Sequence, residues 1–114
     1  EVLARATGDL DAAVLQTDRD LDELSGVVRT AAVPQRLLRH RTRRNQVLAV
    51  ERSLRAVDAV FAHRWGVPAS ARPVLERTWR DLHAGSRHHA NDPARALRGY
   101  GAAALNLPDE EDLL

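Results

Sequence analysis

Cysteine, methionine, lysine and isoleucine are all absent from this sequence of 114 residues. Without cysteine the chain has no disulfide, no thiolate ligand for a metal and no cysteine nucleophile. Without methionine it has no initiator residue, which predicts that the sequence was cut from a longer chain. All 17 basic residues are arginine, and this indicates a GC-rich coding bias more than a functional demand for guanidinium groups.

Long apolar runs are also missing. No stretch approaches the roughly 18 apolar residues of a membrane span. The segment Glu1 to Thr7 lacks the basic start and apolar stretch of a secretory signal. We therefore expect no membrane partner and a cytoplasmic protein. The length of 114 residues suits one domain with one core.

The net charge of +1 is unevenly distributed. Seven acids and three arginines give residues 1–30 a charge of −4, whereas seven arginines and one acid give residues 31–57 a charge of +6. The simplest interpretation is that an acidic first helix lies beside a basic second helix. The alternative is a nucleic-acid surface, formed by Arg36, Arg39, Arg41, Arg43 and Arg44. These arginines point around more than half of the helix and no aromatic residue interleaves them, so we expect no nucleic-acid partner.

Apolar periodicity predicts four helices, over residues 1–29, 34–65, 73–90 and 93–105, followed by an acidic tail at 107–114. On the first helix, residues at alternating spacings of four and three predict packing along its whole length; these seam residues are Leu3, Thr7, Leu10, Val14, Thr17, Leu21, Leu24 and Val28. The pattern starts without a preceding capping residue, so we expect a cut within a helix or at its start.

The connections between the predicted helices are short. Pro34 and Pro73 suit first helical turns. The Gly66–Pro68 segment ends the second helix, and Asp92 with Pro93 forms an N-cap and first position for the fourth. Long helices with short connections imply antiparallel neighbours. The predicted fold is therefore an all-α, antiparallel up-down four-helix bundle, a single C-terminal domain covering residues 1–114 of a larger protein.

The third predicted helix carries most of the chemistry. Asp81 and His88 are seven residues apart, so on a continuous helix they share a face, about 10 Å from each other. Gly85 lies between them, at a cost of up to about 1 kcal/mol relative to alanine. Packing against another helix is the simpler reason to keep this glycine, and close approach of a flat ligand is the alternative. Arg77 can pair with Asp81 four positions later.

Histidines suggest two kinds of site. His83, His88 and His89 cluster in sequence, but the five-residue step from His83 to His88 points these two apart, whereas ligand pairs on helices use steps of three or four. We therefore expect no metal. A single histidine suits proton abstraction from a phenol, or hydrogen bonding to a ligand. Spacing alone does not choose which one.

A longer pattern runs from the third predicted helix into the fourth: Arg77-x-x-Arg80-Asp81, six residues, His88, and then Ala90-Asn91-Asp92-Pro93, with Tyr100-Gly101 further on. This pattern resembles the end of the acyl-CoA-dehydrogenase-fold flavin monooxygenases, the oxygenase components of two-component systems. It is most similar to the secosteroid-phenol and 4-hydroxyphenylacetate hydroxylase group. With the preceding helix and loop, the resemblance covers about 80 residues.

The resemblance implies an N-terminal helical domain, a middle β-domain and this C-terminal bundle. Such enzymes take reduced flavin, FMN or FAD, from a separate reductase and use dioxygen to hydroxylate a small aromatic, here phenolic, substrate. It implies that His88 lies by the flavin and substrate, where it helps hold the peroxyflavin or deprotonates the phenol.

The same resemblance assigns roles to further residues. Gly66, Ser70 and Arg72 are expected near the flavin of a neighbouring subunit, in a homotetramer whose core the bundles form. Structural or orienting roles are expected for Arg77, Arg80, Asp81 and Gly85.

Three alternatives stay open. His89 follows His88 directly, although a continuous helix would point His89 toward the core stripe that contains Leu75 and Trp79. An acyl-CoA dehydrogenase-like oxidoreductase would normally need a glutamate base, and the face of Asp81 and His88 has none. A non-enzymatic helical interaction module would explain the sequence before Pro73 but not the pattern after it.

Overall fold

The computed structural model describes residues 1–30 and 35–109, with the exception of the His89 side chain. The elements follow in the order α1 (Val2–Arg29), α2 (Arg36–Ala62), η1 (Arg64–Gly66), α3 (Arg72–Ser86), η2 (His89–Asn91) and α4 (Pro93–Ala104). The predicted all-α class with four α-helices is confirmed. The acidic tail lies mostly outside the described residues.

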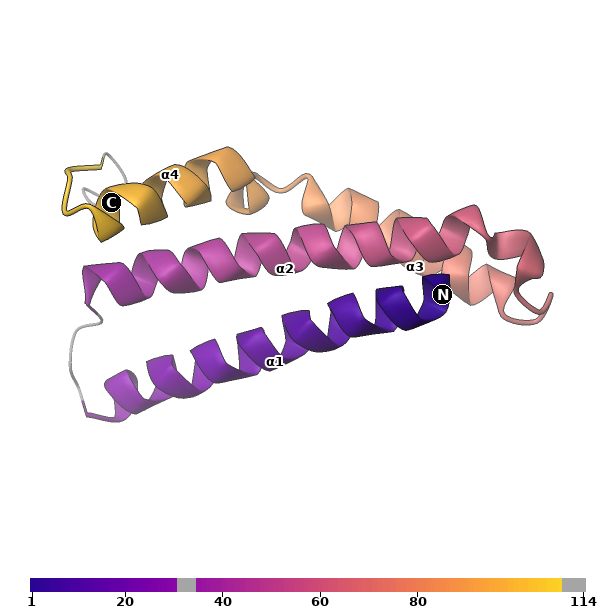
Figure 1. Ribbon diagram of the computed structural model, residues 1–114, viewed down its shortest axis with the longest axis horizontal. Helices are drawn as coiled ribbons and strands as arrows, with labels where there is room; N and C mark the ends of the chain where they lie inside the picture. The colour runs from indigo at the N-terminus through magenta and orange to yellow at the C-terminus, as the bar shows by residue number, and fades with distance from the viewer. Residues whose placement is uncertain (31–34, 110–114) are drawn as a thin grey trace.

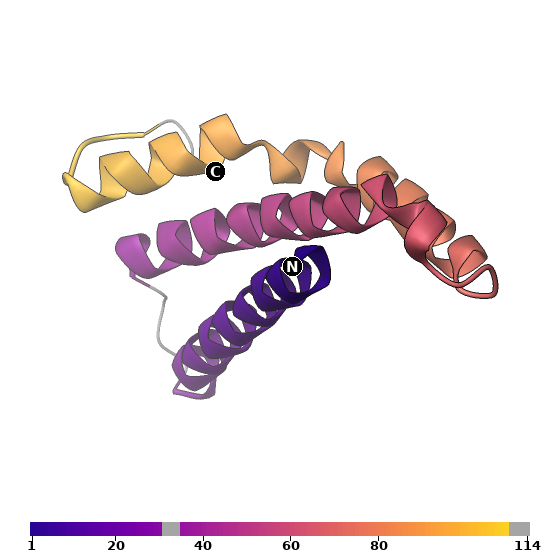
Figure 2. The ribbon, with the colours of Figure 1, turned by 45° about the vertical axis from the view of Figure 1, so that its right-hand side comes forward.

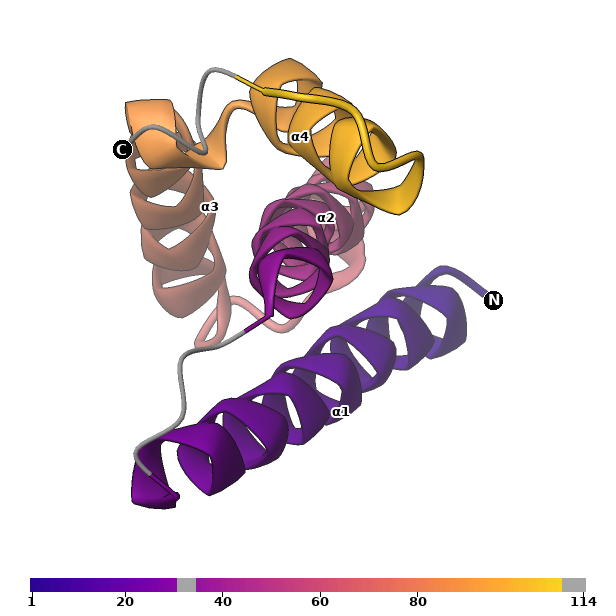
Figure 3. The same cartoon turned by 90° about the vertical axis from the view of Figure 1, so that its left-hand side faces the viewer.

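Helix α2 is the centre of the molecule and contacts the other three α-helices (Figure 1). Helix α1 runs antiparallel along one side of it. On the other side α3 and α4 follow one another, both antiparallel to α2 (Figures 1 and 3). Because α3 and α4 lie end to end, the molecule is elongated, measuring 50 × 28 × 22 Å.

The capping residues behave locally as their chemistry requires. The Asp92 side chain accepts a hydrogen bond from the Ala94 N–H at 3.1 Å, and Pro93 is the first residue of α4, as predicted. Helix α2 ends at Ala62 and the short turn η1 carries the chain to Gly66. Pro34 lies outside the described residues.

The prediction that the third helix extends to residue 90 is wrong, because α3 ends at Ser86. The N–H groups of Arg87 and His88 donate to the carbonyls of Ala84 and Gly85, three residues back rather than four, at 3.4 and 3.3 Å. This tightening is common at helix ends. It places His88 after the helix, so Asp81 and His88 do not share one continuous helical face.

The face that α1 turns toward α2 also differs from the prediction. Its buried residues are Ala6, Ala13 and Asp20, each seven positions after the last. The seam residues Leu3 and Val28 are 67% and 70% exposed. The small alanines let α1 approach α2 closely, whereas periodicity marks an apolar face without showing what covers it.

Helices α1 and α2 diverge toward the end at which α1 finishes (Figure 2). A groove of about 530 Å³ opens between them and is mostly apolar. Its lining includes Leu21 and Leu24 of α1, Val50 of α2 and Leu82 of α3. Within the described ranges, no helix is long and apolar enough to cross a membrane.

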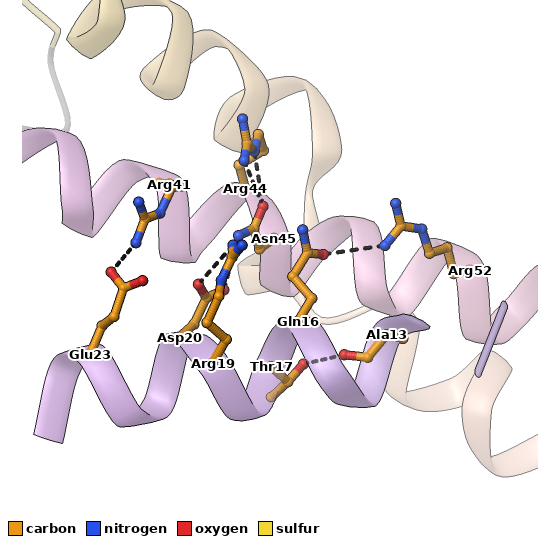
Figure 4. Close-up of polar contacts among 10 residues, drawn as sticks. All are labelled: Ala13, Gln16, Thr17, Arg19, Asp20, Glu23, Arg41, Arg44, Asn45 and Arg52. Atoms are coloured by element: carbon orange, nitrogen blue, oxygen red, sulfur yellow. Dashed lines mark hydrogen bonds and ion pairs between the residues drawn. The ribbon is translucent and has the colours of Figure 1, made fainter. Parts of the chain in front are cut away.

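The prediction that the acidic first helix lies beside the basic second one is confirmed. Arg41 donates to Glu23 across the interface, and Arg52 donates to the Gln16 side chain at 3.2 Å (Figure 4). Arg44 lies 4.1 Å above the ring of Tyr100 on α4. These arginines are therefore held within the chain itself.

Candidate functional site

The segment between α3 and α4 holds His88 in a compact hydrogen-bonded turn. The Asn91 N–H donates to the His88 carbonyl at 2.8 Å. The Asn91 side-chain Nδ2 donates to the Gly85 carbonyl at 3.1 Å, and the His88 N–H donates to the same carbonyl. Asn91 therefore closes a loop between the last turn of α3 and η2, and we call residues 85–91 the His88 turn.

The imidazole of His88 is exposed and is oriented by the backbone. Its Nδ1 accepts a hydrogen bond from the Ala90 N–H at 3.1 Å. The α3 face that leads to this turn, with Arg77, Asp81 and Gly85, is exposed as well. A ligand or another protein surface can therefore reach this face.

The predicted structural residues on α3 do not meet one another. Arg77, Arg80 and Asp81 are all exposed, and among the described residues Asp81 forms no ion pair with either arginine. Their structural role stays a prediction. The side chain of His89, the alternative site, lies outside the described part of the chain, and that alternative stays a prediction.

Gly85 has open space where a side chain would be. A Cβ added there would meet nothing within 4 Å among the described residues, so packing against another of the described helices does not explain the glycine. The glycine that does permit close packing is Gly99, which the sequence analysis missed. A Cβ on Gly99 would lie 2.8 Å from Nδ1 of His40 on α2.

We predict that Gly85→Ala raises the free energy of unfolding of this chain by about 0.5 to 1 kcal/mol, since alanine favours helix and the site is open. Urea unfolding would measure the change. The matched control Gly99→Ala is expected to destabilise by about 1 to 3 kcal/mol through overpacking. Destabilisation by Gly85→Ala would contradict the open environment seen here.

The loop predicted to contact a flavin lies at the other end of α3. Gly66 and Ser70 are exposed, and Arg72 donates from Nε to the Val67 carbonyl at 3.3 Å. The Arg72 guanidinium also lies 5.0 Å from the ring centre of Trp65, which is 70% exposed. Since α3 has 15 residues, this loop and the His88 turn are separated by roughly 20 Å along its axis.

A second polar cluster joins α2 to α3, and the sequence analysis missed its centre, Asp58. The Asp58 carboxylate accepts from Trp79 Nε1 at 2.8 Å and from His83 Nε2 at 2.7 Å. Trp79 stacks on Phe61, with ring centres 4.4 Å apart. The hydrogen bond from His83 is the largest cause that lowers the pKa of Asp58 below its ordinary value of 3.8. His83 is thus committed to a helix-to-helix contact.

This lowered pKa predicts a particular acid response. A carboxyl with a lower pKa in the folded state stabilises the fold above its unfolded-state value, and that stabilisation is lost as pH falls through the folded value. We expect Asp58→Asn to flatten the fall in the free energy of unfolding between about pH 5 and pH 3. The exposed Asp18, changed to Asn, serves as the control and should keep the parent's slope. Equal slopes for Asp58→Asn and the parent would contradict the assignment.

Within the described residues, no group of three or more histidine or acidic side chains is placed to hold a metal ion. The expected absence of a metal stays a prediction.

Comparison with known proteins settles the family. The model of the acyl-CoA dehydrogenase C-terminal domain matches residues 1–93, from the start of α1 to the start of α4. The chain belongs to the acyl-CoA dehydrogenase C-terminal domain family. The fold implied by the resemblance is therefore confirmed.

Two relatives of this acyl-CoA dehydrogenase C-terminal domain are oxygenase subunits with the same name. The flavin-dependent monooxygenase oxygenase subunit HsaA of Rhodococcus jostii (strain RHA1) is 39% identical over 93% of the chain. HsaA of Mycobacterium tuberculosis is 35% identical over 98% of the chain. The chain spans about 28% of the length of each of these relatives. The resemblance to flavin monooxygenases of this fold is thus confirmed.

Two solved structures have a similar arrangement of helices. The HsaA monooxygenase from M. tuberculosis superposes with a TM-score of 0.81 at 34% identity, over 94% of this chain and 28% of that one. The 3-HSA hydroxylase from Rhodococcus sp. RHA1 gives a TM-score of 0.83 at 35% identity, over 97% of this chain and 29% of that one. The arrangement of helices in this domain is therefore shared with flavin-dependent relatives.

A buried polar layer ties the acyl-CoA dehydrogenase C-terminal domain together across three helices. Asp20 on α1 and Asn45 on α2 are only 3% and 2% exposed. Asn45 donates from Nδ2 to Asp20 at 2.9 Å and accepts from Arg44 Nε and Nη2 at 3.0 and 2.9 Å (Figure 4). Because Arg44 also lies over Tyr100, the layer reaches from α1 through α2 to α4.

Proposed function

We propose that this domain is the C-terminal part of a reduced-flavin-dependent monooxygenase that uses dioxygen to hydroxylate a phenolic substrate. In this proposal His88 faces the flavin and the substrate. The reduced flavin, FMN or FAD, comes from a separate reductase, no metal takes part, and the enzyme works in the cytoplasm. The observation that carries the proposal is the likeness to two HsaA oxygenase subunits along nearly the whole chain.

The described residues fit a flat cofactor at the His88 turn. The α3 face beside it is exposed, Gly85 presents no side chain, and a Cβ there would still meet open space. His88 adds one oriented polar ring. When bound, the flavin supplies the redox chemistry with dioxygen, and this chain's own residues bind and orient the ligands.

A homotetramer with bundles at its core is the proposed assembly. The support is an apolar stripe on α1 that this chain leaves exposed, made of Leu3, Leu10, Val14, Leu21 and Val28. The separation of roughly 20 Å along α3 between the loop Gly66–Arg72 and the His88 turn also fits contacts to two different flavins. In that arrangement Gly66, Ser70 and Arg72 serve a neighbouring subunit.

The test uses the full-length protein that carries this domain, a flavin reductase, NADH and a set of phenols. The expected result is a hydroxylated phenol, formed in proportion to the oxygen consumed. Consumption of NADH and oxygen without hydroxylated product, across phenols that include secosteroid-like ones, would contradict the proposal.

The family itself favours one alternative, an acyl-CoA dehydrogenase-like oxidoreductase. The segment from Gly85 to Pro93 contains no glutamate that could act as the base. Bleaching of the bound oxidised flavin by a fatty acyl-CoA, with no reductase present, would establish this alternative in place of hydroxylation. Tight binding of a protein partner without any flavin effect would instead establish an interaction module.

A further inference from the structure

The His88 turn does more than place a histidine near a ligand, because it also determines which ring nitrogen carries the proton. A neutral imidazole has one N–H and one lone pair. Nδ1 of His88 accepts the Ala90 N–H at 3.1 Å, so its lone pair must lie there. The proton of the neutral ring is then on Nε2.

Other protonation states lose this contact. Either the Nδ1–H tautomer or the imidazolium would place a second hydrogen between Nδ1 and the Ala90 N–H. Each would leave two donors facing one another. The backbone of the turn therefore favours one form of the ring, the Nε2–H tautomer.

The turn that supplies the Ala90 N–H is itself held by Asn91. Its Nδ2 binds the Gly85 carbonyl at 3.1 Å and its N–H binds the His88 carbonyl at 2.8 Å. Asn91 thus joins the end of α3 to η2 on both sides of the histidine. Neither a glycine pattern nor the spacing of histidines shows this connection, since it depends on α3 ending at Ser86.

We propose that His88 acts on the phenolic substrate as a hydrogen-bond donor through Nε2–H and not as the base, and that Asn91 is a positioning residue that fixes this form of the ring. The inference rests on the proposed hydroxylase function. In it His88 binds and orients the phenol oxygen, and the phenol proton does not pass to this ring.

Replacing His88 by an amide side chain distinguishes a hydrogen-bond donor from a general base. The side-chain amide of glutamine can place an N–H near the position of Nε2, whereas that of asparagine reaches only the Nδ1 position, and neither accepts a proton near neutral pH. In the full-length enzyme with its reductase, we expect His88→Gln to keep coupled hydroxylation within about tenfold of the parent, since only a geometrically imperfect donor replaces the ring. His88→Asn and His88→Ala are expected to lose about 100-fold or more.

Asn91 is tested through a double-mutant cycle. Asn91→Ala is expected to lower coupled hydroxylation, the hydroxylated product formed per oxygen consumed, about tenfold in the parent enzyme. In the His88→Gln background the loss is expected to be much smaller, because glutamine has no tautomer to fix. The melting temperature is measured for every variant. Equal losses in both backgrounds would show a merely structural role and overturn the assignment of Asn91.

The remaining outcomes are also distinct. If His88→Gln falls about 100- to 10,000-fold, together with His88→Ala, then His88 is a general base and the donor role is overturned. If His88→Asn is more active than His88→Gln, Nδ1 faces the substrate and the tautomer assignment is wrong. If the unmodified enzyme hydroxylates no phenol, the proposed function fails, independently of the role of the ring.

Discussion

If the domain belongs to the proposed hydroxylase, His88→Ala is expected to lower coupled hydroxylation by the full-length enzyme by about 100- to 1,000-fold, the usual loss on removal of one oriented hydrogen-bond donor from an active site. The fold should persist, because His88 is exposed and lies in the turn between α3 and α4 rather than in the core. The Ala90 N–H that His88 accepts can turn to solvent when the ring is gone. Loss of activity with an intact fold is the expected combination.

The measurement compares product formed, oxygen consumed and hydrogen peroxide released with the same reductase. In the proposed enzyme, peroxide release should rise as hydroxylation falls, because oxygen would still be consumed without transfer to the substrate. The melting temperature and the oligomeric state are recorded beside the kinetics, and both should match the parent.

His89→Ala is the matched control, one position away in the same turn. It is expected to keep the coupling of the parent. If His89→Ala carries the loss and His88→Ala does not, the site assignment moves by one residue. An unchanged coupling ratio in both variants would remove this histidine pair from the mechanism.

Local chemistry was readable from the sequence wherever it depended on neighbouring residues. Asp92 and Pro93 start α4 as predicted, because an N-cap and a first-turn proline act within one helical turn. The acidic and basic halves of residues 1–57 likewise predicted that α1 lies beside α2, and the contact between Glu23 and Arg41 confirms it.

Features that depend on distant contacts were missed. Asp58 meets Trp79 and His83 from another helix, at separations of 21 and 25 residues. Gly99 is required by His40, which precedes it by more than fifty positions. No period or motif in one segment encodes such a meeting.

The candidate site was partly predictable, for two different reasons. His88 came from the resemblance, and its placement beside flavin and substrate stays a proposal. The end of α3 was missed because no glycine or proline follows Ser86 directly, and the side chain that closes the turn, Asn91, lies five residues beyond it. The apolar seam of α1 did not indicate which surface covers it, because Leu3 and Val28 are 67% and 70% exposed in this chain, whereas Ala6 and Ala13 are the apolar residues of α1 that are buried.

The largest expected effect on stability comes from Asn45→Ala. We predict that it lowers the free energy of unfolding of this chain by about 3 kcal/mol, because it removes a hydrogen bond from the charged, buried carboxylate of Asp20. Asn45 is 2% exposed and supplies the 2.9 Å hydrogen bond to Asp20. In the described residues the other carboxylate oxygen, Oδ1, has no hydrogen bond, and Arg19 lies 3.6 Å from it.

Urea unfolding would measure the change, with Gln46→Ala as the control. Gln46 is the next residue of α2 and is exposed, so its replacement should change the free energy of unfolding by less than about 0.5 kcal/mol. A loss below about 1 kcal/mol for Asn45→Ala would mean that water reaches Asp20 through the groove between α1 and α2, which Asp20 lines.

Replacing both members of the pair decides what the polar layer does. If Asp20→Leu with Asn45→Leu restores the stability that Asn45→Ala removes, the layer specifies the pairing of α1 with α2 rather than strengthening it. Arg44 favours a role of the polar layer in specifying this pairing, because it binds Asn45 and also lies over Tyr100 of α4. A shift of α1 by one turn along α2 would separate Asp20 from this group, so that result would mean that the polar layer fixes the direction in which the exposed apolar stripe of α1 faces. In the proposed homotetramer, this stripe is the surface offered to neighbouring subunits.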